Sequence, residues 1–358
     1  MRPTVGESSD GAGSPGTVLG TTPRRGRRLW TVLARPLWAL ASLVLLALLC
    51  LRWLDAPLPQ VVPVLQAGQP GYQALAVAMA LLALVTRTGR RRYLPWVAPA
   101  LIVCLVVGVQ TAQRQARAPE VPTQKVGELT LFSTNVYFGQ ADASAVAEVV
   151  RDRDVDVLVV VEASPAFVER LDAEGLDRTH PYRAGDPRDD TANGSLILCR
   201  VECEPVPGTS AAEDGSGAVT VFQQPAVTVR TAKGDPAGDV VVRAAHPFPP
   251  IPPGNQAWRD TLSDLDRWQR ERPEPRLVLA GDFNASAGHP GFRALLRTLD
   301  DAAGASRRPL VRTWPHGRRV PPFVALDHVL TRGLAVDGYE TVRVPGSDHD
   351  AVLVGLVW

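Results

Sequence analysis

Six apolar runs in the last two thirds of the chain end or begin at polar side chains of only a few types. All of these side chains are carboxylates, carboxamides or imidazoles, which bind metal ions, orient water and transfer protons. One of them alone would be explained as a strand end, but six would form a site if the strands lie side by side. The positions are Asn135, Glu162, His246, Asp282 with Asn284, Asp327, and Asp348 with His349.

Some of these residues have the chemistry of a metal site. Glu162 and Asp348 offer hard oxygen ligands suited to Mg²⁺ or Mn²⁺, and Asn135 can add a carbonyl oxygen. The sequence has no Cys/His cluster with zinc-ligand spacing. The expected cofactor is therefore Mg²⁺ or Mn²⁺.

The remaining residues have the chemistry of hydrolysis. Asp282 can activate a water molecule while Asn284 orients it, and His246 and His349 can donate to phosphate oxygens or transfer protons. The sequence contains neither a G-x-S-x-G nucleophile motif nor a Walker loop. A metal ion and an activated water, without a protein nucleophile, predict hydrolysis of a phosphoester.

Alternating strand and helix patterns must position these residues. About nine strands and four helices in about 230 residues predict one α/β domain over 127–358, with sheets covered by helices. The longest expected helix is Gln256–Glu271, with Asn255 as its cap. The expected strands are Leu129–Ser133, Val155–Val161, Ser195–Cys199, Val219–Val229, Val240–Ala245, Leu277–Ala280, Val324–Leu330, Leu334–Val344 and Val352–Val357.

The polar residues lie in short motifs that follow one another in a fixed order. These are STNV with Asn135, VLVVV before Glu162, NGSLILCR around Asn193, His246, GDFN at 281–284, LDHVL at 326–330 and GSDHDAV at 346–352. Over about residues 127–358 this ordered set resembles the metal-dependent endonuclease/exonuclease/phosphatase superfamily. That superfamily includes pancreatic deoxyribonuclease, abasic-site endonucleases, neutral sphingomyelinases and inositol-phosphate phosphatases. The resemblance implies a deoxyribonuclease-like four-layer α/β sandwich with its site at one edge.

The resemblance also implies a role for each residue. Glu162 would be the principal metal ligand with Asn135 and Asp348 nearby, and Asp282 would activate the attacking water with Asn284 as its orienting partner. His246 and His349 would contact the phosphate, and Asp327 would fix the orientation of His349. The chain departs from the common pattern at Asp350, whose extra negative charge would either bind a second ion or repel polyanions. His180 and His289, which lie beside prolines, are expected in loops.

The first third of the chain has a different character. Residues 1–28 have the composition of a disordered basic tail, and a membrane region follows over 29–112. Its three apolar segments, Pro36–Leu51, about Val61–Thr86 and Tyr93–Thr111, predict three transmembrane helices. A cleaved signal peptide and buried helices of a soluble domain are the alternatives. Residues 113–126 are polar with two prolines and are expected to form a linker.

Arginines set the expected orientation of this multi-pass protein in the cell membrane. They cluster at 24–28 and 87–92, which places the N-terminus in the cytoplasm and, after three crossings, the C-terminal domain outside it. An oxidising exterior would permit a disulfide between Cys199 and Cys203, with two reduced thiols as the alternative.

Charge helps to choose the substrate class. Residues 1–118 carry 13 basic and 3 acidic side chains, whereas 119–358 carry 25 and 34. The acidic domain lacks the general positive field that nucleic-acid binding needs. The leading interpretation is a membrane-anchored phosphoesterase acting on an envelope lipid or cell-wall precursor, similar to the bacterial membrane-anchored VanJ-type proteins associated with teicoplanin resistance. An extracellular nuclease and a non-enzymatic envelope protein that keeps the fold are the alternatives. The expected partners are thus the lipid bilayer and a phosphoester substrate.

Overall fold

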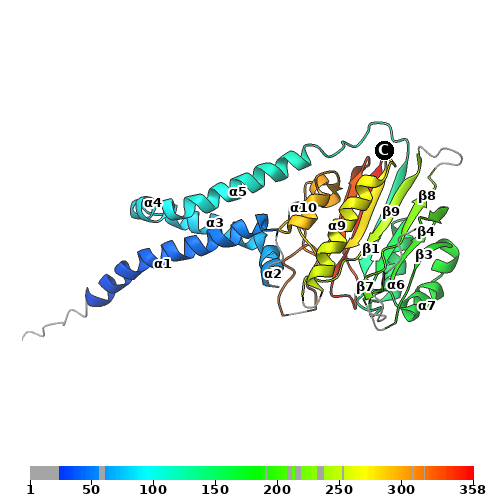
Figure 1. Ribbon diagram of the computed structural model, residues 1–358, viewed down its shortest axis with the longest axis horizontal. Coiled ribbons are helices and arrows are strands. Elements are labelled where there is room, and N and C mark those ends of the chain that lie inside the picture. Colours follow the sequence, from blue (N-terminus) through cyan, green and yellow to red (C-terminus); the bar gives the residue numbers. More distant parts are fainter. Residues whose placement is uncertain are drawn as a thin grey trace, which may run out of the picture.

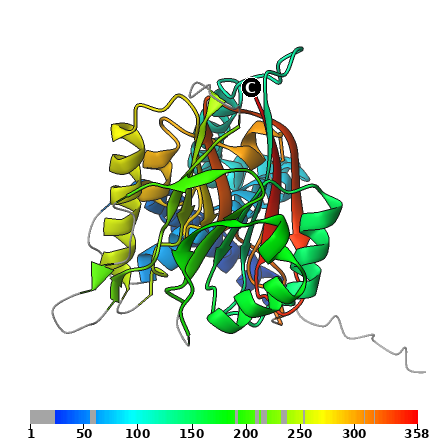
Figure 2. The ribbon, with the colours of Figure 1, turned by 90° about the vertical axis from the view of Figure 1, so that its right-hand side faces the viewer.

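Two six-stranded mixed sheets lie face to face at the centre of the C-terminal domain (Figures 1 and 2). The computed structural model describes residues 24–55, 61–189, 192–207, 212–213, 219–231, 238–251, 254–308, 310–317 and 319–358. Most of the expected tail, residues 1–23, therefore lies outside the described residues, and helix α1 begins within its last part, at Arg24.

The first sheet contains the N-terminal and C-terminal strands of the domain. In spatial order its strands are β13 (Ala335–Arg343), β14 (Asp350–Val357), β1 (Glu128–Asn135), β2 (Val157–Val161), β4 (Ser195–Cys199) and β3 (Tyr182–Asp186). Only β1 and β2 pair in parallel, and the other neighbours are antiparallel.

The second sheet repeats this plan around another parallel pair, β9 and β10. Its strands in spatial order are β11 (Asp300–Asp301), β12 (Asp327–Arg332), β10 (Leu277–Asp282), β9 (Val240–Ala245), β8 (Ala226–Val229) and β5 (Cys203–Pro205). A small hairpin of β6 (Ala212–Glu213) and β7 (Val219–Val221) lies outside both sheets.

Helices cover the outer face of each sheet and complete the expected four layers. On the first sheet these are α6 (Ala143–Asp152) and α7 (Pro165–Ala173), and on the second α9 (Asn255–Glu271) and α10 (Pro290–Leu295). Alternate residues of one strand serve two cores: Val157 and Val159 face the other sheet, whereas Leu158 and Val160 face the helices. Burial on both faces explains why these strands are apolar throughout. Two short helices, α8 (Leu176–Thr179) and α11 (Ala302–Ala305), complete the domain.

Three details of the predicted elements are wrong. The expected strand Val219–Val229 is split into β7 and β8, because the Gln223 N–H leaves the ladder to donate to the Asn193 side chain at 2.8 Å. The strand predicted from Val324 begins only at Asp327, since Val324 forms an isolated bridge with Trp314. Helix α9 starts one residue earlier than expected, with Gly254 at the cap position, so Asn255 lies inside it.

Cys199 and Cys203 form a disulfide, which decides between the two alternatives left open by the sequence. Cys199 ends β4 in the first sheet and Cys203 begins β5 in the second, with Cα atoms 6.4 Å apart. Both residues are buried in the core between the sheets. The bond therefore ties one sheet to the other at the point where the chain crosses between them.

The N-terminal third forms a bundle of helices beside the domain (Figure 1). Its elements are α1 (Arg24–Cys50), the 3₁₀ turn η1 (Leu51–Trp53), α2 (Val61–Ala67), α3 (Gln69–Leu84), α4 (Arg87–Arg92) and α5 (Leu94–Gln115). Among the described residues, two stretches are long and apolar enough to cross a membrane, Leu33–Trp53 and Leu94–Gln115. The prediction of three transmembrane helices is wrong on this point. Helix α3 has 16 residues, about 24 Å at 1.5 Å per residue, which is less than the hydrocarbon core of a bilayer.

The chain passes along this bundle in alternating directions. Helices α1 and α5 both run toward the catalytic domain and contact each other, and α3 packs against both and carries the chain back (Figure 1). The start of α1 and the arginine-rich helix α4 consequently lie at the end of the bundle that is far from the domain. The outward apolar side chains stay exposed, with Leu40 at 59% and Leu105 at 66%.

Candidate active site

The topology brings the polar ends of four strands to one edge of the sandwich. Strands β1 and β2 run in parallel, as do β9 and β10, so the carboxyl ends of each pair meet at the same edge. Asn135 and Asp282 are the last residues of β1 and β10, while Glu162 and His246 directly follow β2 and β9. Antiparallel strands add their first residues at this edge, because Asp327 of β12 pairs with Asp282 in register.

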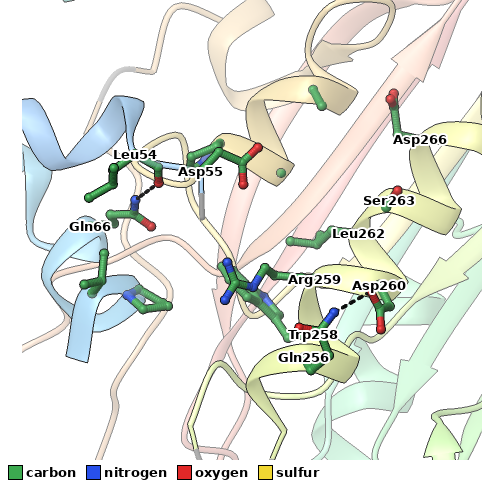
Figure 3. Close-up of a pocket in the computed structure, with 15 residues that line it drawn as sticks. Leu54, Asp55, Gln66, Gln256, Trp258, Arg259, Asp260, Leu262, Ser263 and Asp266 are labelled. Carbon is green, nitrogen blue, oxygen red and sulfur yellow. Dashed lines mark hydrogen bonds between the residues drawn. The ribbon is translucent and has the colours of Figure 1, made fainter. Parts of the chain in front are cut away.

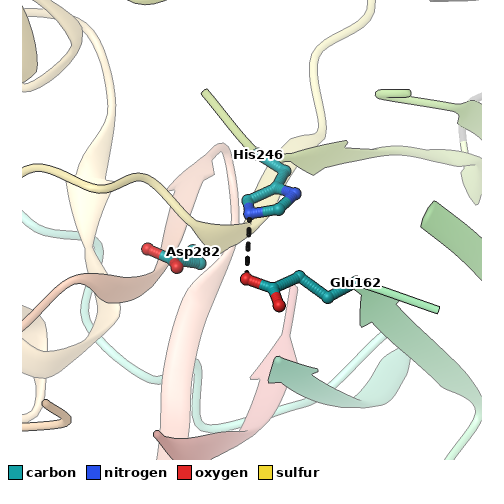
Figure 4. A group of neighbouring side chains, drawn as sticks. All are labelled: Glu162, His246 and Asp282. Atoms are coloured by element: carbon teal, nitrogen blue, oxygen red, sulfur yellow. Dashed lines mark ion pairs between the residues drawn. The ribbon is translucent and has the colours of Figure 1, made fainter. Parts of the chain in front are cut away.

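Glu162 lies at the centre of the first group of side chains. The Asn135 side-chain amide donates to Glu162 Oε1 at 2.9 Å, and the Phe138 N–H donates to Glu162 Oε2 at 3.0 Å. His246 Nε2 lies 3.7 Å from Glu162 Oε1 (Figure 4). Burial raises the pKa of Glu162 to about 7 and lowers the pKa of His246 to about 4. His246 is therefore a neutral imidazole at neutral pH. Glu162 is partly protonated near pH 7, and a cation bound beside it would displace that proton.

Asp282 connects this group to the second one. Its Oδ1 accepts from the Asn284 N–H at 2.8 Å, and its Oδ2 accepts from the Asn135 amide at 3.2 Å. The Asn284 side chain donates to the Pro247 carbonyl oxygen at 3.0 Å, which anchors residues 283–285, here termed the catalytic loop, to the chain just after β9. Burial raises the pKa of Asp282, although the nearby His349 opposes this. A carboxylate with a raised pKa is a stronger proton acceptor.

His349 and Asp327 form the expected pair. His349 Nδ1 donates to Asp327 Oδ2 at 2.8 Å, which leaves Nε2 facing Asp282 Oδ2 at 3.7 Å. Burial alone would lower the pKa of His349, but Asp327 and Asp282 outweigh it and raise the pKa to about 10. His349 is thus a fixed cation at neutral pH, suited to binding a phosphate oxygen.

Asp348 lies at the margin of this arrangement. Its Oδ1 is 3.9 Å from His349 Nε2, and its Oδ2 accepts from the Trp314 indole at 3.4 Å. The neighbouring Asp350 is paired with His316, with 2.7 Å between His316 Nε2 and Asp350 Oδ2. Because a histidine offsets the charge of a carboxylate only when it is protonated, the predicted role of Asp350 in binding a second ion or repelling polyanions stays a prediction.

Comparison with known proteins agrees with this geometry. The sequence profile described as the Endonuclease/Exonuclease/phosphatase family matches residues 132–349, which is more than half of the chain and includes every predicted site residue from Asn135 to His349. The chain belongs to the endonuclease/exonuclease/phosphatase family. Members of this family are phosphoester hydrolases that depend on a divalent metal ion.

Individual relatives are more distant. No curated protein matches the chain by sequence. Among solved structures, it is similar to D. rerio TDP2 complexed with a single-strand DNA product, at 16% identity, with 64% of this chain and 98% of that chain covered and a TM-score of 0.48. It is also similar to the mannosyl-6-phosphatase Bt3783 of Bacteroides thetaiotaomicron, at 16% identity, 64% and 100% coverage and a TM-score of 0.48.

The acidic and histidine side chains of this site are close enough together to bind a divalent cation. One ligand atom from each of Glu162, His246 and Asp282 lies within 4.8 Å of the others, and Asp282, Asp327 and His349 form a second such group. Two buried carboxylates with raised pKa values are stabilised when a cation neutralises them. Carboxylate oxygens are also the ligands that Mg²⁺ and Mn²⁺ prefer.

The predicted metal ligands Asn135, Glu162 and Asp348 lie close to these groups of acidic and histidine side chains, and their role as ligands stays a prediction. Glu162 belongs to the first group, whereas Asp348 belongs to neither. Asn135 presents its N–H₂ to Glu162 and Asp282, and its Oδ1 accepts from the Tyr137 N–H at 2.9 Å. In this orientation the Asn135 amide holds the two carboxylates in place.

Sequence reasoning missed the residues that hold His246 in place. The Gln224 side-chain oxygen accepts from the His246 N–H at 3.3 Å, and the Phe222 ring lies 5.0 Å from the imidazole. Both side chains are buried. The sequence did contain a pattern that could have identified them, because Gln223 and Gln224 interrupt an apolar run just as Glu162 does.

The backbone at the site adopts conformations that ordinary residues avoid. Glu162 and Asn284 have φ values of +58° and +47°, in the left-handed region, which turns their side chains out of the strand direction. Gly281 has φ +147°, and a Cβ added there would lie 2.1 Å from the Ala245 carbonyl oxygen. The close approach of β9 and β10 at this edge therefore requires glycine.

Substitution of Gly281 tests this close approach. In Gly281→Ala the added methyl group must separate β10 from β9 where Asp282 and His246 leave the sheet. A displacement of about 1 Å can cost about 100-fold in rate, so we expect a fall in kcat of that order in the folded protein. Gly304→Ala is the matched control, since a Cβ there meets nothing within 4 Å. Wild-type kcat in Gly281→Ala would show that the strand spacing does not limit catalysis.

Proposed function

We propose that this family member is a membrane-anchored, divalent-metal-dependent phosphoesterase that hydrolyses a lipid-linked phosphoester or pyrophosphate of the cell envelope outside the cytoplasm. One observation supports the proposed catalytic activity: the two groups of side chains share Asp282. Glu162 and His246 lie on one side of it and His349 on the other. The same arrangement supplies metal ligands, a proton acceptor and a cationic phosphate contact.

The chain's own residues divide the reaction among them. Asp282 accepts the proton of the attacking water, Asn284 holds that carboxylate through its N–H, and His349 contacts a phosphate oxygen as a cation held by Asp327. Neutral His246 adds a second phosphate contact or a metal ligand. Glu162, aligned by Asn135 and with Asp348 nearby, would hold the metal ion, which when bound neutralises charge on the phosphoester.

Anchoring is supported by the surface of the N-terminal bundle. Large apolar side chains cover both candidate spans, and Leu40 and Leu105 are more than half exposed. A bilayer would cover this surface, whereas water would not favour it. Helices α1 and α5 both run toward the domain, and α2 and α3 together carry the chain back between them in the sequence, so the arginine-rich end and the catalytic domain lie at opposite ends of the bundle (Figure 1). The positive-inside rule then favours an extracytoplasmic domain, as does the disulfide.

The substrate class can be tested with the full chain in detergent micelles. We expect hydrolysis of a polyprenyl pyrophosphate in the presence of Mg²⁺ or Mn²⁺, and its loss with a chelator. The VanJ-type interpretation requires this activity on an envelope lipid. Preferential, salt-sensitive cleavage of plasmid DNA would favour the nuclease instead. Absence of hydrolysis of polyprenyl pyrophosphate, phospholipid and DNA would favour a non-enzymatic envelope protein.

The topology has a separate test. A reporter that is active only outside the cytoplasm, fused after Gln124, should be active, because this position precedes β1 on the domain side of α5. A fusion within α4, at the other end of α5, is the matched control and should be inactive. A reporter that is active only in the cytoplasm and works at position 124 would overturn the extracytoplasmic assignment.

A further inference from the structure

The catalytic domain contacts the N-terminal helices through the segment Ser286–Arg293, here termed the docking segment. It begins two residues after Asn284 and includes the start of α10. His289 Nε2 lies 2.9 Å from the carbonyl oxygen of Pro63 in α2, and His289 is 1% exposed. The sequence placed His289 in an ordinary loop, but the structure buries it between two parts of the chain that are 226 residues apart.

Each of the two ring nitrogens of His289 makes one hydrogen bond. Its Nδ1 accepts from the Ser286 N–H at 2.8 Å, so this nitrogen carries no proton. Nε2 must then carry the N–H and donate to the Pro63 carbonyl oxygen. Burial lowers the pKa of His289 to about 4, which keeps this neutral form at physiological pH. The His289 side chain thereby hydrogen-bonds both to the turn after the catalytic loop and to helix α2.

Two further contacts join the same surfaces. Arg293 donates to the carbonyl oxygens of Arg52 and, at 2.8 Å, of Gly288. A Cβ added at Gly288 would lie 2.0 Å from the carbonyl oxygen of Gln66, so the loop backbone approaches α2 with no room for a side chain. Beside these contacts a cavity of about 330 Å³ lies between α2 and α9, lined by Val62, Gln66 and Leu262 among others (Figure 3). The docking segment therefore contacts α2 directly at His289 and Gly288, while α11 of the same domain contacts α5.

The docking segment is also packed against the catalytic loop. The Phe283 ring meets the Phe292 ring edge-on with centroids 5.4 Å apart, and Phe283 lies between Asp282 and Asn284. Asn284 in turn donates its backbone N–H to Asp282. A shift of the docking segment would thus reach the pair that positions the water.

We propose that α2 positions the catalytic loop through His289, so that the seating of the N-terminal helices on the domain sets the catalytic rate. His289 acts here as a positioning residue. This inference rests on the proposed phosphoesterase function for its kinetic part. The chain between the two candidate spans would then serve catalysis.

The experiment uses the full chain in detergent micelles and compares His289→Ala, His289→Gln and Gly288→Ala with the control Gly304→Ala. Amide hydrogen exchange is measured together with kcat and KM for the soluble probe bis(p-nitrophenyl) phosphate in Mn²⁺. We expect His289→Ala and Gly288→Ala to speed exchange in α2, in the docking segment and at residues 283–285. We also expect kcat to fall about tenfold with KM nearly unchanged, because the loop is misplaced but the phosphate contacts remain. Glutamine can donate to Pro63 and accept from Ser286, so His289→Gln should recover part of the loss.

Three other outcomes would each contradict one claim: the positioning role of His289, the docking of α2, or the proposed function. Faster exchange with unchanged kcat would overturn the positioning role and leave a purely structural contact. Unchanged exchange in α2 for both His289→Ala and Gly288→Ala would overturn the docking itself. If the wild type hydrolyses no phosphoester, the proposed function fails, whereas exchange that spreads from α2 to residues 283–285 would still support the positioning of the loop.

Discussion

Asp282→Asn is expected to lower kcat by about 10² to 10⁴ with little change in KM for a soluble phosphodiester, the range typical of losing a general base. Asp282 is buried at the junction of both side-chain groups, and its raised pKa suits it to accept the proton of water. Asparagine keeps the size of the side chain and an oxygen for the Asn284 N–H, but it cannot take up the proton. The rate in single-turnover kinetics at saturating Mn²⁺ measures this loss directly.

Two controls separate this loss from a general disturbance. Asp337→Asn removes a carboxylate from β13 that only pairs with Lys125 at the surface, so its kcat should equal that of the wild type. In Asp282→Asn the loss of a neighbouring negative charge should also lower the pKa of His349, which is visible in an NMR titration. A shifted His349 pKa with wild-type kcat would mean that another group activates the water.

The strand ends that form the site could be predicted because the local sequence shows where each apolar strand stops. Val157–Val161 is apolar up to Glu162, and GDFN follows another apolar run, so the sequence shows where the chain leaves each strand. The parallel pairing of β1 with β2 and of β9 with β10 then brings these exits together. Helix α9 and the strands β4 and β9 were likewise located to within a residue.

What could not be predicted depends on contacts between distant segments. The orientation of the Asn135 amide is set by Glu162, Asp282 and the Tyr137 N–H, none of which its own motif reveals. His289 has an unremarkable sequence context, and its role depends on Pro63. Helix α3 has the composition of a span but is limited in length by its start at Gln69, whose side chain donates to the Leu48 carbonyl oxygen.

Glu162→Gln is expected to weaken Mn²⁺ binding by at least about 100-fold, because it removes a charge at the centre of the donor set. The same variant should abolish a pH dependence that the wild type shows. Burial raises the pKa of Glu162 to about 7, so below pH 7 the proton competes with the metal ion for the carboxylate. Wild-type affinity should therefore rise about tenfold per pH unit up to pH 7 and level off above it.

Mn²⁺ binding followed by EPR at pH 6 and pH 8 measures both effects without relying on catalysis. Glu340→Gln is the matched control, since Glu340 lies on the exposed strand β13 and pairs with Arg153, so its affinity should equal that of the wild type at both pH values. If Glu162→Gln binds Mn²⁺ tightly at pH 8, the ion is held by the second group, around Asp282 and His349, and not by the group around Glu162.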